Sequence, residues 1–327
     1  MEKYRVGIVG ATGMVGQRFI SLLKDHPWFE VNCVAASARS AGKTYREAVG
    51  ERWAFAWEIP EKVAGMTVVD AADIDEVSKH VDFVFCAVDM KKDEIRALEE
   101  AYAKHEIPVV SNNSACRGIE DVPMVVPEIN ADHLAVIEAQ KKRLGTKNGF
   151  IAVKPNCSIQ SYVPALTPLL DFEPEKVSVC TYQAISGAGK TFKTWPEMVD
   201  NVIPYIGGED EKSENEPLKL WGHVEDGKIV NAALPVISAQ CLRVACSDGH
   251  MAAVSVSFKK KPTIEQIKER WANYETEAQR LELPSAPKPF LQYFEDPSRP
   301  QTRLDRDFQN GFGVSIGRLR EDKLFDY

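Results

Sequence analysis

Arg5-Val-Gly-Ile-Val-Gly-Ala-Thr-Gly-Met-Val-Gly16 is the stretch that decides the fold of the first half of the chain. Its apolar start predicts a short buried strand, and the apolar spacing that continues to Leu23 predicts an amphipathic helix. Glycines at 10, 13 and 16 permit a tight turn, close approach of the backbone to a pyrophosphate, and close packing of helix on strand. A glycine fingerprint alone is weak, but a further strand signal at 31–36 supplies the required context. The stretch therefore predicts a dinucleotide-binding unit, with these residues at the cofactor: Gly10, Thr12, Gly13, Met14 and Val15.

The end of the second strand indicates which dinucleotide is bound. An enzyme that uses NAD usually carries Asp or Glu there, for the ribose hydroxyls. This chain has Ser37-Ala-Arg-Ser40 instead. The hydroxyls of Ser37 and Ser40 and the guanidinium of Arg39 suit a 2′-phosphate, so we predict NADP rather than NAD. The alternative is a solvated loop that is merely polar.

Strand and helix signals continue to alternate through the first half. Strand signals at 66–69, 83–87 and 108–111 flank a charged helical segment at 91–103. This alternation predicts an α/β fold with a doubly wound parallel sheet. We expect a Rossmann-type NADP-binding domain over residues 1–156. An α+β catalytic and dimerisation domain with a mixed sheet should follow over residues 157–327.

The second half begins with a candidate nucleophile in Val153-Lys-Pro-Asn-Cys-Ser158. Apolar residues recur at helical spacing from Ser158 to Leu170, which places Cys157 where a helix is expected to begin. Free N–H groups and the helix dipole favour a thiolate at such a position. The alternative is a buried structural cysteine, which is how most free cysteines behave. Cys116 is a weaker competitor, because its loop lacks the setting between a strand and a helix.

A candidate base follows later in the chain. Residues 241–247 alternate like a strand, Asp248-Gly249 marks a turn, and a strand at 251–258 is expected to pair with the first. His250 lies between them, close to Arg243 only if a bulge at Gly249 re-aims it. Ala184–Thr191 superficially resembles a phosphate-binding loop, but Phe192-Lys-Thr-Trp-Pro196 is a poor helix start. We therefore interpret its glycines as a tight turn beside the site.

Composition excludes several other classes. The 327 residues are 44% hydrophobic and 27% charged, with a formal net charge of -8, which disfavours a nucleic-acid or anionic membrane surface. There is no apolar run of about 18 residues to span a membrane, and the N-terminus lacks the apolar core of a signal peptide. Seven scattered cysteines argue against a disulfide framework or a metal site and favour a reducing compartment, the cytoplasm.

With these segments assembled, the chain resembles the aspartate-semialdehyde dehydrogenases of the archaeal and fungal branch. The match extends from Arg5 to Leu319. The segments that carry it are residues 10–16, 35–43, 155–158, 183–189, 200–206, 243–250 and 299–307. Members of this family usually continue past Arg320 into another strand and a C-terminal helix, which this sequence, ending at Tyr327, does not include.

The resemblance implies a mechanism and a role for each site residue. Cys157 would attack aspartate semialdehyde, His250 would move protons, and hydride would pass to NADP, leaving a thioester that phosphate attacks. The implied set is Cys157, His250 and Gln183 for catalysis, Arg243, Glu209, Arg117, Lys212 and Asn156 for substrate and phosphate, and Ser186 and Gly187 for the cofactor. Arg243 would hold the α-carboxylate, Glu209 the ammonium, and Arg117 with Lys212 the phosphate. The family also implies a homodimer or homotetramer.

Two other functions remain open from the sequence. A malonyl-CoA reductase would use the same thioester chemistry, although its substrate has no amino group to occupy Glu209. A catalytically silent NADP-binding or scaffold protein would leave Cys157 inert. Dependence on phosphate or on coenzyme A distinguishes the first from the proposed reaction, and alkylation of Cys157 tests the second.

Overall fold

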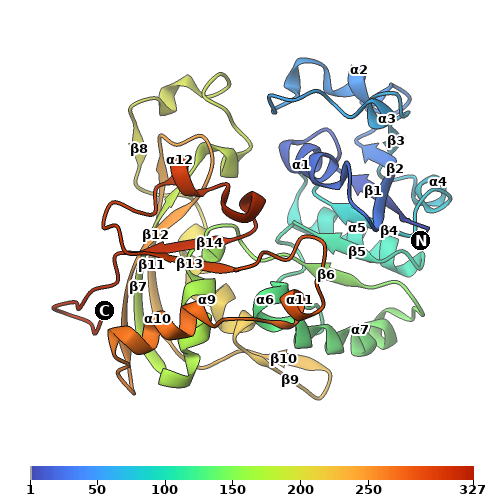
Figure 1. Cartoon of the computed structure of the whole chain (residues 1–327). Helices are drawn as coiled ribbons and strands as arrows, with labels where there is room; N and C mark the ends of the chain where they lie inside the picture. The colour runs from blue at the N-terminus through green and yellow to red at the C-terminus, as the bar shows by residue number, and fades with distance from the viewer. Residues whose placement is uncertain (1) are drawn as a thin grey trace. The chain divides into compact units, whose positions relative to one another are not determined.

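The computed structural model describes residues 2–327, and their contacts divide the chain into two compact units (Figure 1). The first unit comprises the residues up to Val125, Asp132–Lys154 and Val224–Ile229. The second comprises Val126–Ala131, Pro155–His223 and Val230–Tyr327. The domain boundary expected between residues 156 and 157 stays a prediction.

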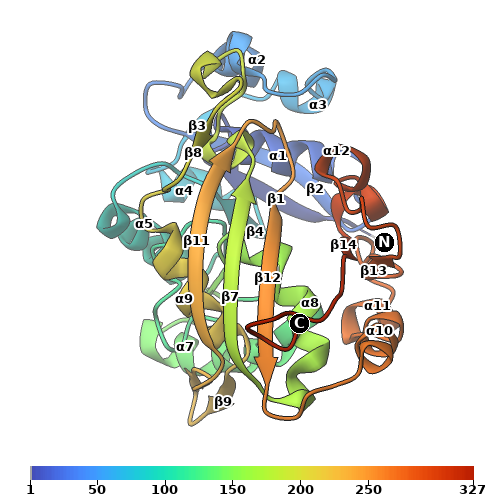
Figure 2. The ribbon, with the colours of Figure 1, turned by 90° about the vertical axis from the view of Figure 1, so that its left-hand side faces the viewer.

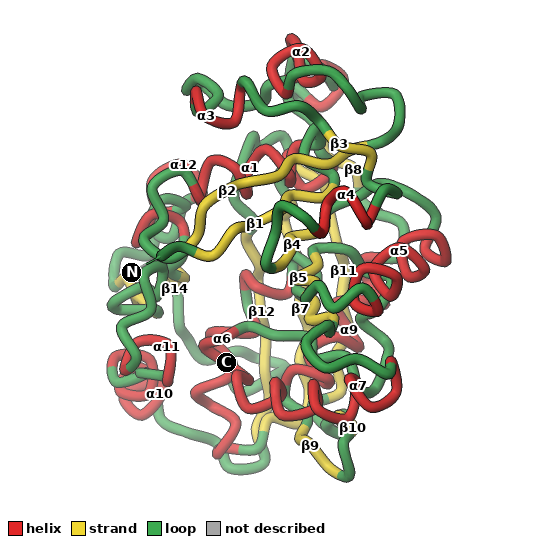
Figure 3. Tube along the Cα trace, turned by 90° about the vertical axis from the view of Figure 1, so that its right-hand side faces the viewer, coloured by secondary structure: helices red, strands yellow, loops and turns green. Residues whose placement is uncertain are grey.

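The first unit is built on a six-stranded sheet in the order β3-β2-β1-β4-β5-β6. Every neighbouring pair in it is parallel, and Figure 3 shows β3, β2, β1, β4 and β5 side by side. The strands are β1 (Tyr4–Val9), β2 (Phe29–Ala36), β3 (Val69–Asp70), β4 (Phe83–Cys86), β5 (Val109–Ser111) and β6 (Ile151–Val153). Helix α1 (Met14–Leu23) packs on β1 and β2, and α5 (Lys92–Lys104) packs on β5 and β6. The predicted doubly wound parallel sheet is confirmed.

Burial explains why β1 lies at the centre of this sheet. Its residues Val6, Ile8 and Val9 are all fully buried, as expected for a parallel strand covered on both faces. Burying a side chain of this size contributes about 1.5–3 kcal/mol. The strand order reverses between β1 and β4, and at such a switch point open α/β sheets bind their ligands. The glycine-rich turn follows β1 directly at this point.

The strand expected at 66–69 is shorter in the structure. Only Val69–Asp70 pairs with β2. The preceding residues bond instead to the loop after β2, since Val68 N–H donates to Lys43 O and Tyr45 N–H donates to Met66 O. The apolar pattern marked the buried segment correctly but not its bonding partner.

The second unit is built on a four-stranded sheet in the order β12-β7-β11-β8. Its strands are β7 (Pro174–Gln183), β8 (Val202–Ile203), β11 (Val236–Val244) and β12 (Met251–Phe258). β7 and β11 are parallel, whereas β12 and β8 run antiparallel to their neighbours, so the predicted mixed sheet is confirmed. Figure 2 shows β11, β7 and β12 side by side, and helix α9 (Glu209–Leu220) packs on β11.

The expected hairpin of residues 241–247 with 251–258 is wrong. β7 lies between β11 and β12. The connection between these two strands is held by the segment that follows β7, because Ile185 N–H donates to Cys246 O and Ser186 N–H to Ser247 O. The turn at 245–250 therefore passes over the end of β7, which brings His250 toward the residues that follow Gln183.

The single helix expected after Cys157 is also wrong. The segment consists of three short pieces: η3 (Ile159–Ser161), α8 (Val163–Leu166) and η4 (Thr167–Phe172). Pro164 lies in the first turn of α8 and Pro168 in the first turn of η4, where a missing N–H removes no helical hydrogen bond. Proline at these positions therefore ends one piece and starts the next. Cys157 does not lie at the start of a long helix, so the argument from a helix dipole does not apply.

The remaining elements complete the two units. Thr263 caps α10 (Ile264–Ala272) through a capping box with Gln266. Two short strands, β13 (Leu291–Phe294) and β14 (Val314–Gly317), pair in parallel. The others are α2 (Tyr45–Val49), η1 (Gly50–Arg52), α3 (Glu61–Ala64), α4 (Ile74–Ser78), α6 (Pro127–Asn130), η2 (Ala131–Val136), α7 (Ile137–Leu144), η5 (Ile185–Ala188), η6 (Pro196–Met198), β9 (His223–Glu225), β10 (Lys228–Val230), α11 (Glu277–Arg280), α12 (Thr302–Asp305) and η7 (Phe308–Gly311).

Within residues 2–327, no helix is both long enough and apolar enough to cross a membrane. The same residues contain no group of three or more His, Cys, Asp or Glu side chains placed to hold a metal ion.

Candidate active site

The turn that carries Cys157 is organised by the side chain of Asn156. The backbone N–H and the hydroxyl of Ser158 both donate to Asn156 Oδ1, at 2.9 and 2.6 Å. The backbone N–H of Asn156 donates to Glu216 Oε2 at 2.5 Å. Asn156 and Ser158 are buried, whereas Cys157 between them is partly exposed. The turn is therefore fixed on both sides of a thiol that a small molecule can reach.

Cys116, the competing nucleophile, has a different environment. Its side chain is fully buried. Burial raises the pKa of its thiol, and the nearby Glu99 carboxylate raises it further. A thiol that is buried and resists ionisation is a poor nucleophile, so Cys157 is the better candidate for the nucleophile.

Glu209 is the centre of a hydrogen-bond network above the sheet. The Asn156 amide donates to both of its carboxylate oxygens at 3.0 Å, and Gln183 Nε2 donates to Oε2 at 3.2 Å. Lys212 Nζ donates to Oε1 at 2.8 Å. Burial acts to raise the pKa of this carboxyl, but the hydrogen bond and charge of Lys212 and the two amide donors outweigh it and lower the pKa below its ordinary value. The most polar stretch of the sequence thus supplies a buried, ionised carboxylate.

The parallel pairing of β7 and β11 places two predicted site residues side by side. Gln183 is opposite Arg243, and one step back Thr181 is opposite Cys241. All four residues are buried. Residues two apart on a strand share a face, so these four form one patch beneath α9.

Arg243 is held at the end of this patch. Its Nη1 donates to Ala184 O at 2.7 Å, and its side chain is 6% exposed. Burial lowers the pKa of the guanidinium, while the charges of Cys157 and Glu209 act in the opposite direction. Glu209 is bonded to Asn156, the chain neighbour of Cys157, and to Gln183, the residue opposite Arg243, so the three site residues are linked through these two amides.

His250 reaches the same place from the turn before β12. Gly249 has a φ of +89°, a conformation that favours glycine. Ala184 N–H donates to His250 Nδ1 at 3.1 Å. A Cβ atom on Gly187 would lie 2.9 Å from Arg243 Nη1 and 3.0 Å from His250 Nε2. Both side chains therefore lie against Gly187, so the condition under which His250 would lie close to Arg243 is met.

Most of the other predicted site residues belong to the first unit, whereas Ser186 follows β7 in the second unit and is partly exposed. Arg117 is buried, and its Nη2 donates to Asn112 O at 3.0 Å. Ser37 and Arg39 are exposed in the turn after β2, which is closed by a bond from Ser40 N–H to Ser37 O. The anion contacts expected of these residues stay predictions.

The glycine turn after β1 has the predicted geometry. Gly10 has a φ of +88°, and a Cβ there would lie 2.3 Å from Ala87 O. A Cβ on Gly16 would lie 2.3 Å from Gly10 O, so α1 approaches the turn as closely as expected. A Cβ on Gly13 would meet nothing nearer than 3.6 Å, which leaves its backbone approachable. Thr12, Met14 and Val15 lie in this turn and the first turn of α1 and are not buried.

Sequence reasoning missed two residues of the site. Thr181 is completely buried, and its hydroxyl donates to Gln183 Oε1 at 3.0 Å. Glu216 accepts the backbone N–H of Asn156, beside Cys157, although it lies in a charged stretch of the sequence. A signal for Glu216 existed, because it lies seven residues after Glu209 and so shares its helical face.

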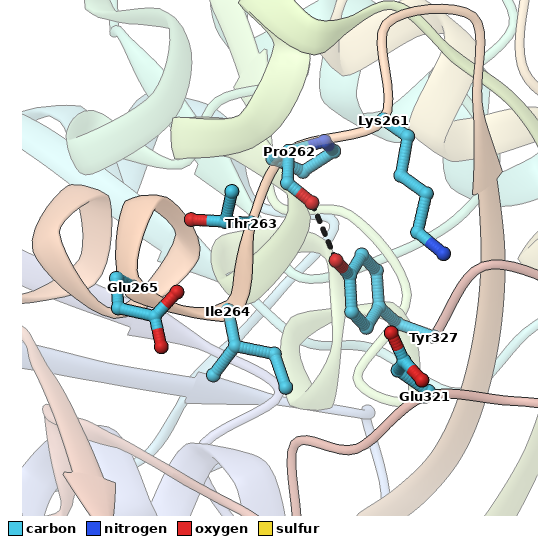
Figure 4. A pocket seen from close by; sticks show the side chains of 7 residues that line it. All are labelled: Lys261, Pro262, Thr263, Ile264, Glu265, Glu321 and Tyr327. Carbon is cyan, nitrogen blue, oxygen red and sulfur yellow. Dashed lines mark hydrogen bonds between the residues drawn. The ribbon is translucent and has the colours of Figure 1, made fainter.

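A pocket at the end of the chain lies elsewhere in the second unit. It has a volume of about 360 Å³ and is lined by Lys261, Pro262, Thr263, Ile264, Glu265, Glu321 and Tyr327 (Figure 4). The Tyr327 hydroxyl donates to Pro262 O. None of the predicted site residues lines it, so its volume is no guide to the reaction.

A dinucleotide-binding sheet, together with a second unit that carries a partly exposed cysteine and holds a histidine and an arginine against Gly187, is typical of a thiol-dependent aldehyde dehydrogenase. Comparison with protein families agrees. A family model described as the NAD binding domain of semialdehyde dehydrogenase matches residues 5–137, and one for the dimerisation domain of semialdehyde dehydrogenase matches residues 166–327.

Comparison with individual relatives identifies the family more closely. The chain is 42% identical to an aspartate-semialdehyde dehydrogenase of Archaeoglobus fulgidus, over 98% of this chain and 90% of that protein. It is 44% identical to one of Schizosaccharomyces pombe, over 98% and 90% respectively. The structure of the Candida albicans enzyme with NADP superposes with a TM-score of 0.89 at 37% identity, covering 99% of this chain and 91% of that chain. The chain belongs to the aspartate-semialdehyde dehydrogenase family, as the resemblance implied.

Proposed function

We propose that the protein interconverts L-aspartate 4-semialdehyde and 4-phospho-L-aspartate with NADP and phosphate, through a thioester on Cys157, in the biosynthesis of lysine, threonine and methionine. One observation carries the choice of substrate. Ionised Glu209 is bonded to Asn156, which precedes the partly exposed Cys157, and to Gln183, while the guanidinium of Arg243 is bonded to Ala184, the residue after Gln183. A carboxylate and a guanidinium beside a thiol match the ammonium and the α-carboxylate of an amino acid that carries an aldehyde.

In the proposed reaction, Cys157 is the nucleophile and His250 the proton carrier. The Cys157 sulfur adds to the aldehyde carbon, and the thiol proton is transferred so that a thiohemiacetal forms. Loss of a hydride from carbon and of a proton from oxygen gives the thioester, with His250 accepting the proton. A phosphate oxygen then attacks the thioester carbon, and the sulfur leaves as thiolate. A positioned proton carrier of this kind contributes typically about 10²–10⁴-fold.

Binding of the substrate is assigned to the charged and amide groups around the thiol. Arg243 would hold the α-carboxylate bidentately, a task for a planar guanidinium. Glu209 would hold the ammonium, with Asn156 fixing its orientation. Gln183 would donate to the acyl oxygen, and Arg117 with Lys212 would hold the phosphate.

The first unit suits the cofactor. NADP, when bound, supplies the acceptor for the hydride. Only glycine fits at positions 10 and 16, because a Cβ at either would lie 2.3 Å from a backbone oxygen. The exposed Ser37 and Arg39 leave the turn after β2 open to a 2′-phosphate, and Ser186 and Gly187 are assigned to the nicotinamide end.

We also propose a homodimer or homotetramer located in the cytoplasm. The outward face of the second sheet carries exposed apolar side chains, among them Tyr182 and Val236, and the matching family model is a dimerisation domain. All seven cysteines are free, which suits a reducing compartment. Sedimentation equilibrium would give the number of subunits, and a monomer at micromolar concentration would refute the assembly. A fluorescent fusion expressed in the source cell, together with cell fractionation, would test the location.

The test of the reaction is the absorbance of NADPH formed from aspartate semialdehyde and NADP. We expect reduction that depends on phosphate and not on coenzyme A, and that is lost in Cys157→Ser while NADP binding is retained. Dependence on coenzyme A would favour the malonyl-CoA reductase type of reaction. Absence of reduction, with Cys157 inert to alkylation, would indicate a silent NADP-binding protein.

A further inference from the structure

Thr181 is a buried hydroxyl residue to which the mechanism gives no role. It lies on β7, two residues before Gln183 and on the same face. Its side chain is completely buried, and its hydroxyl donates to Gln183 Oε1 at 3.0 Å. Packing alone would be served by valine, which has the same shape and no polar atom.

The Gln183 amide is held at both of its ends. Its Nε2 donates to Glu209 Oε2 at 3.2 Å, and an ionised carboxylate can only accept. Its Oε1 accepts from Thr181. These two bonds determine which end of the amide is oxygen and which is nitrogen, and they fix the rotation of the side chain about its last bond. A buried amide held by a single bond would keep more of that freedom.

The two bonds also determine what Gln183 can offer a substrate. An amide nitrogen has two hydrogens, of which Glu209 takes one. The other hydrogen remains as a donor for an acyl oxygen. Oxygen that gathers charge during attack by a thiol is stabilised by donors that are already oriented, so the orientation of this N–H affects the rate more than the binding.

We propose that Thr181 is a positioning residue for the reaction, which orients Gln183 so that an Nε2 hydrogen faces the acyl group. The proposal rests on the proposed function of Gln183. Thr181 itself does not touch the substrate; it acts through the Gln183 amide, in a chain of hydrogen bonds from Thr181 to Gln183 to Glu209. This chain connects the carboxylate that would bind the ammonium with the amide that would bind the acyl oxygen.

The test is a set of variants with matched shapes. Thr181→Val keeps the shape and removes the hydroxyl, and Thr181→Ser keeps the hydroxyl. We expect Thr181→Val to lower kcat by about three- to tenfold, the effect of one neutral hydrogen bond, with KM for the semialdehyde changed less than about twofold. Thr181→Ser should remain within about twofold of the wild type. Thr181→Ala serves as a second removal of the hydroxyl if the valine variant folds poorly, as judged by its melting temperature.

A double-mutant cycle separates action through Gln183 from a general structural role. In a Gln183→Ala background, Thr181→Val should have no further effect on kcat, because the group it orients is absent. If Thr181 acted instead through Cys241, its neighbour on β11, kcat would fall equally in both backgrounds. That result, or an unchanged kcat in Thr181→Val, would overturn the proposal.

A measurement without substrate keeps this test independent of the proposed function. The side-chain amide resonances of Gln183 can be assigned by their loss in Gln183→Ala. In the wild type we expect both N–H signals to exchange slowly with solvent, to exchange faster in Thr181→Val, and to stay protected in Thr181→Ser. Equal exchange rates in wild type and Thr181→Val would refute the orienting role, whatever reaction the protein catalyses.

Discussion

Replacing Gly187 by alanine should damage catalysis while leaving the fold intact. The added Cβ would lie 2.9 Å from Arg243 Nη1 and 3.0 Å from His250 Nε2. Ordinary contacts begin at about 3.5 Å, so each group must move by roughly half an ångström. Neither can move freely, because Arg243 is bonded to Ala184 O at 2.7 Å and His250 to Ala184 N–H at 3.1 Å. A misplacement of about 1 Å can cost about 10²-fold, so we expect kcat/KM to fall by about 10–100-fold.

Gly189 provides the matched control two residues further on. A Cβ there would meet nothing within 4 Å, but its φ is +66°. Gly189→Ala should therefore cost about 1–2 kcal/mol of stability and leave kcat/KM within a few-fold of the wild type. Gly187 has no such φ, so Gly187→Ala should show the opposite pattern, with nearly unchanged stability.

Steady-state formation of NADPH and thermal melts of both variants give the comparison. Because Gly187 is also assigned to the cofactor, calorimetric titration with NADP is needed to show whether the loss comes from weaker cofactor binding. Wild-type kcat/KM in Gly187→Ala would refute the placement of Arg243 and His250. A loss of activity shared equally by both glycine variants would point to the loop as a whole instead.

Three other predictions concern single residues. Because the pKa of Glu209 is lowered in the folded protein, the ionised carboxylate stabilises the fold above the ordinary glutamate pKa of about 4.3, and this contribution is lost as pH falls through the lower folded value. Glu209→Gln should therefore lower the free energy of unfolding by about 1–3 kcal/mol in denaturant melts at all pH values from 5 to 8. A loss of stability that shrinks within that pH window would contradict the assignment. Iodoacetamide should label Cys157 well before buried Cys116, with protection by the semialdehyde, as read by peptide mass spectrometry; equal rates would speak against Cys157 as the nucleophile. Gly16→Ala, whose Cβ would lie 2.3 Å from Gly10 O, should weaken NADP binding by at least tenfold in the same calorimetric titration, and unchanged binding would refute the role of this turn.

The first unit could be predicted because its signals are local. The strand at β1, the glycine turn and α1 follow one another within one short stretch, and each restricts the next. The capping box of Thr263 and Gln266 is similarly local, because both partners lie within four residues of the sequence. In these places one window of sequence contains all the partners that determine the structure.

The second unit was harder because its partners are distant in sequence. Nothing near β11 shows that β7, rather than β12, lies beside it. The apolar spacing after Cys157 was real, since Val163, Leu166 and Leu169 are all buried. This spacing predicted one helix because the period of apolar residues does not show where a helix is interrupted. Here Pro164 and Pro168 set the interruptions, since each starts a new short helical piece.

Glu209 shows how a residue of the site can be hidden in a charged run. Each carboxylate has about four places for a donor, and here two are taken by the Asn156 amide, one by Gln183 and one by Lys212. An ammonium that binds Glu209 must therefore replace one of these donors. Asn156 is buried and tied to Ser158, and Gln183 is buried and tied to Thr181, whereas the Lys212 side chain is 30% exposed. Lys212 is therefore the donor that can most easily move away from Glu209. On the proposed function, binding of the amino group would release this cation toward the phosphate, so a single carboxylate would couple recognition of one end of the substrate to chemistry at the other.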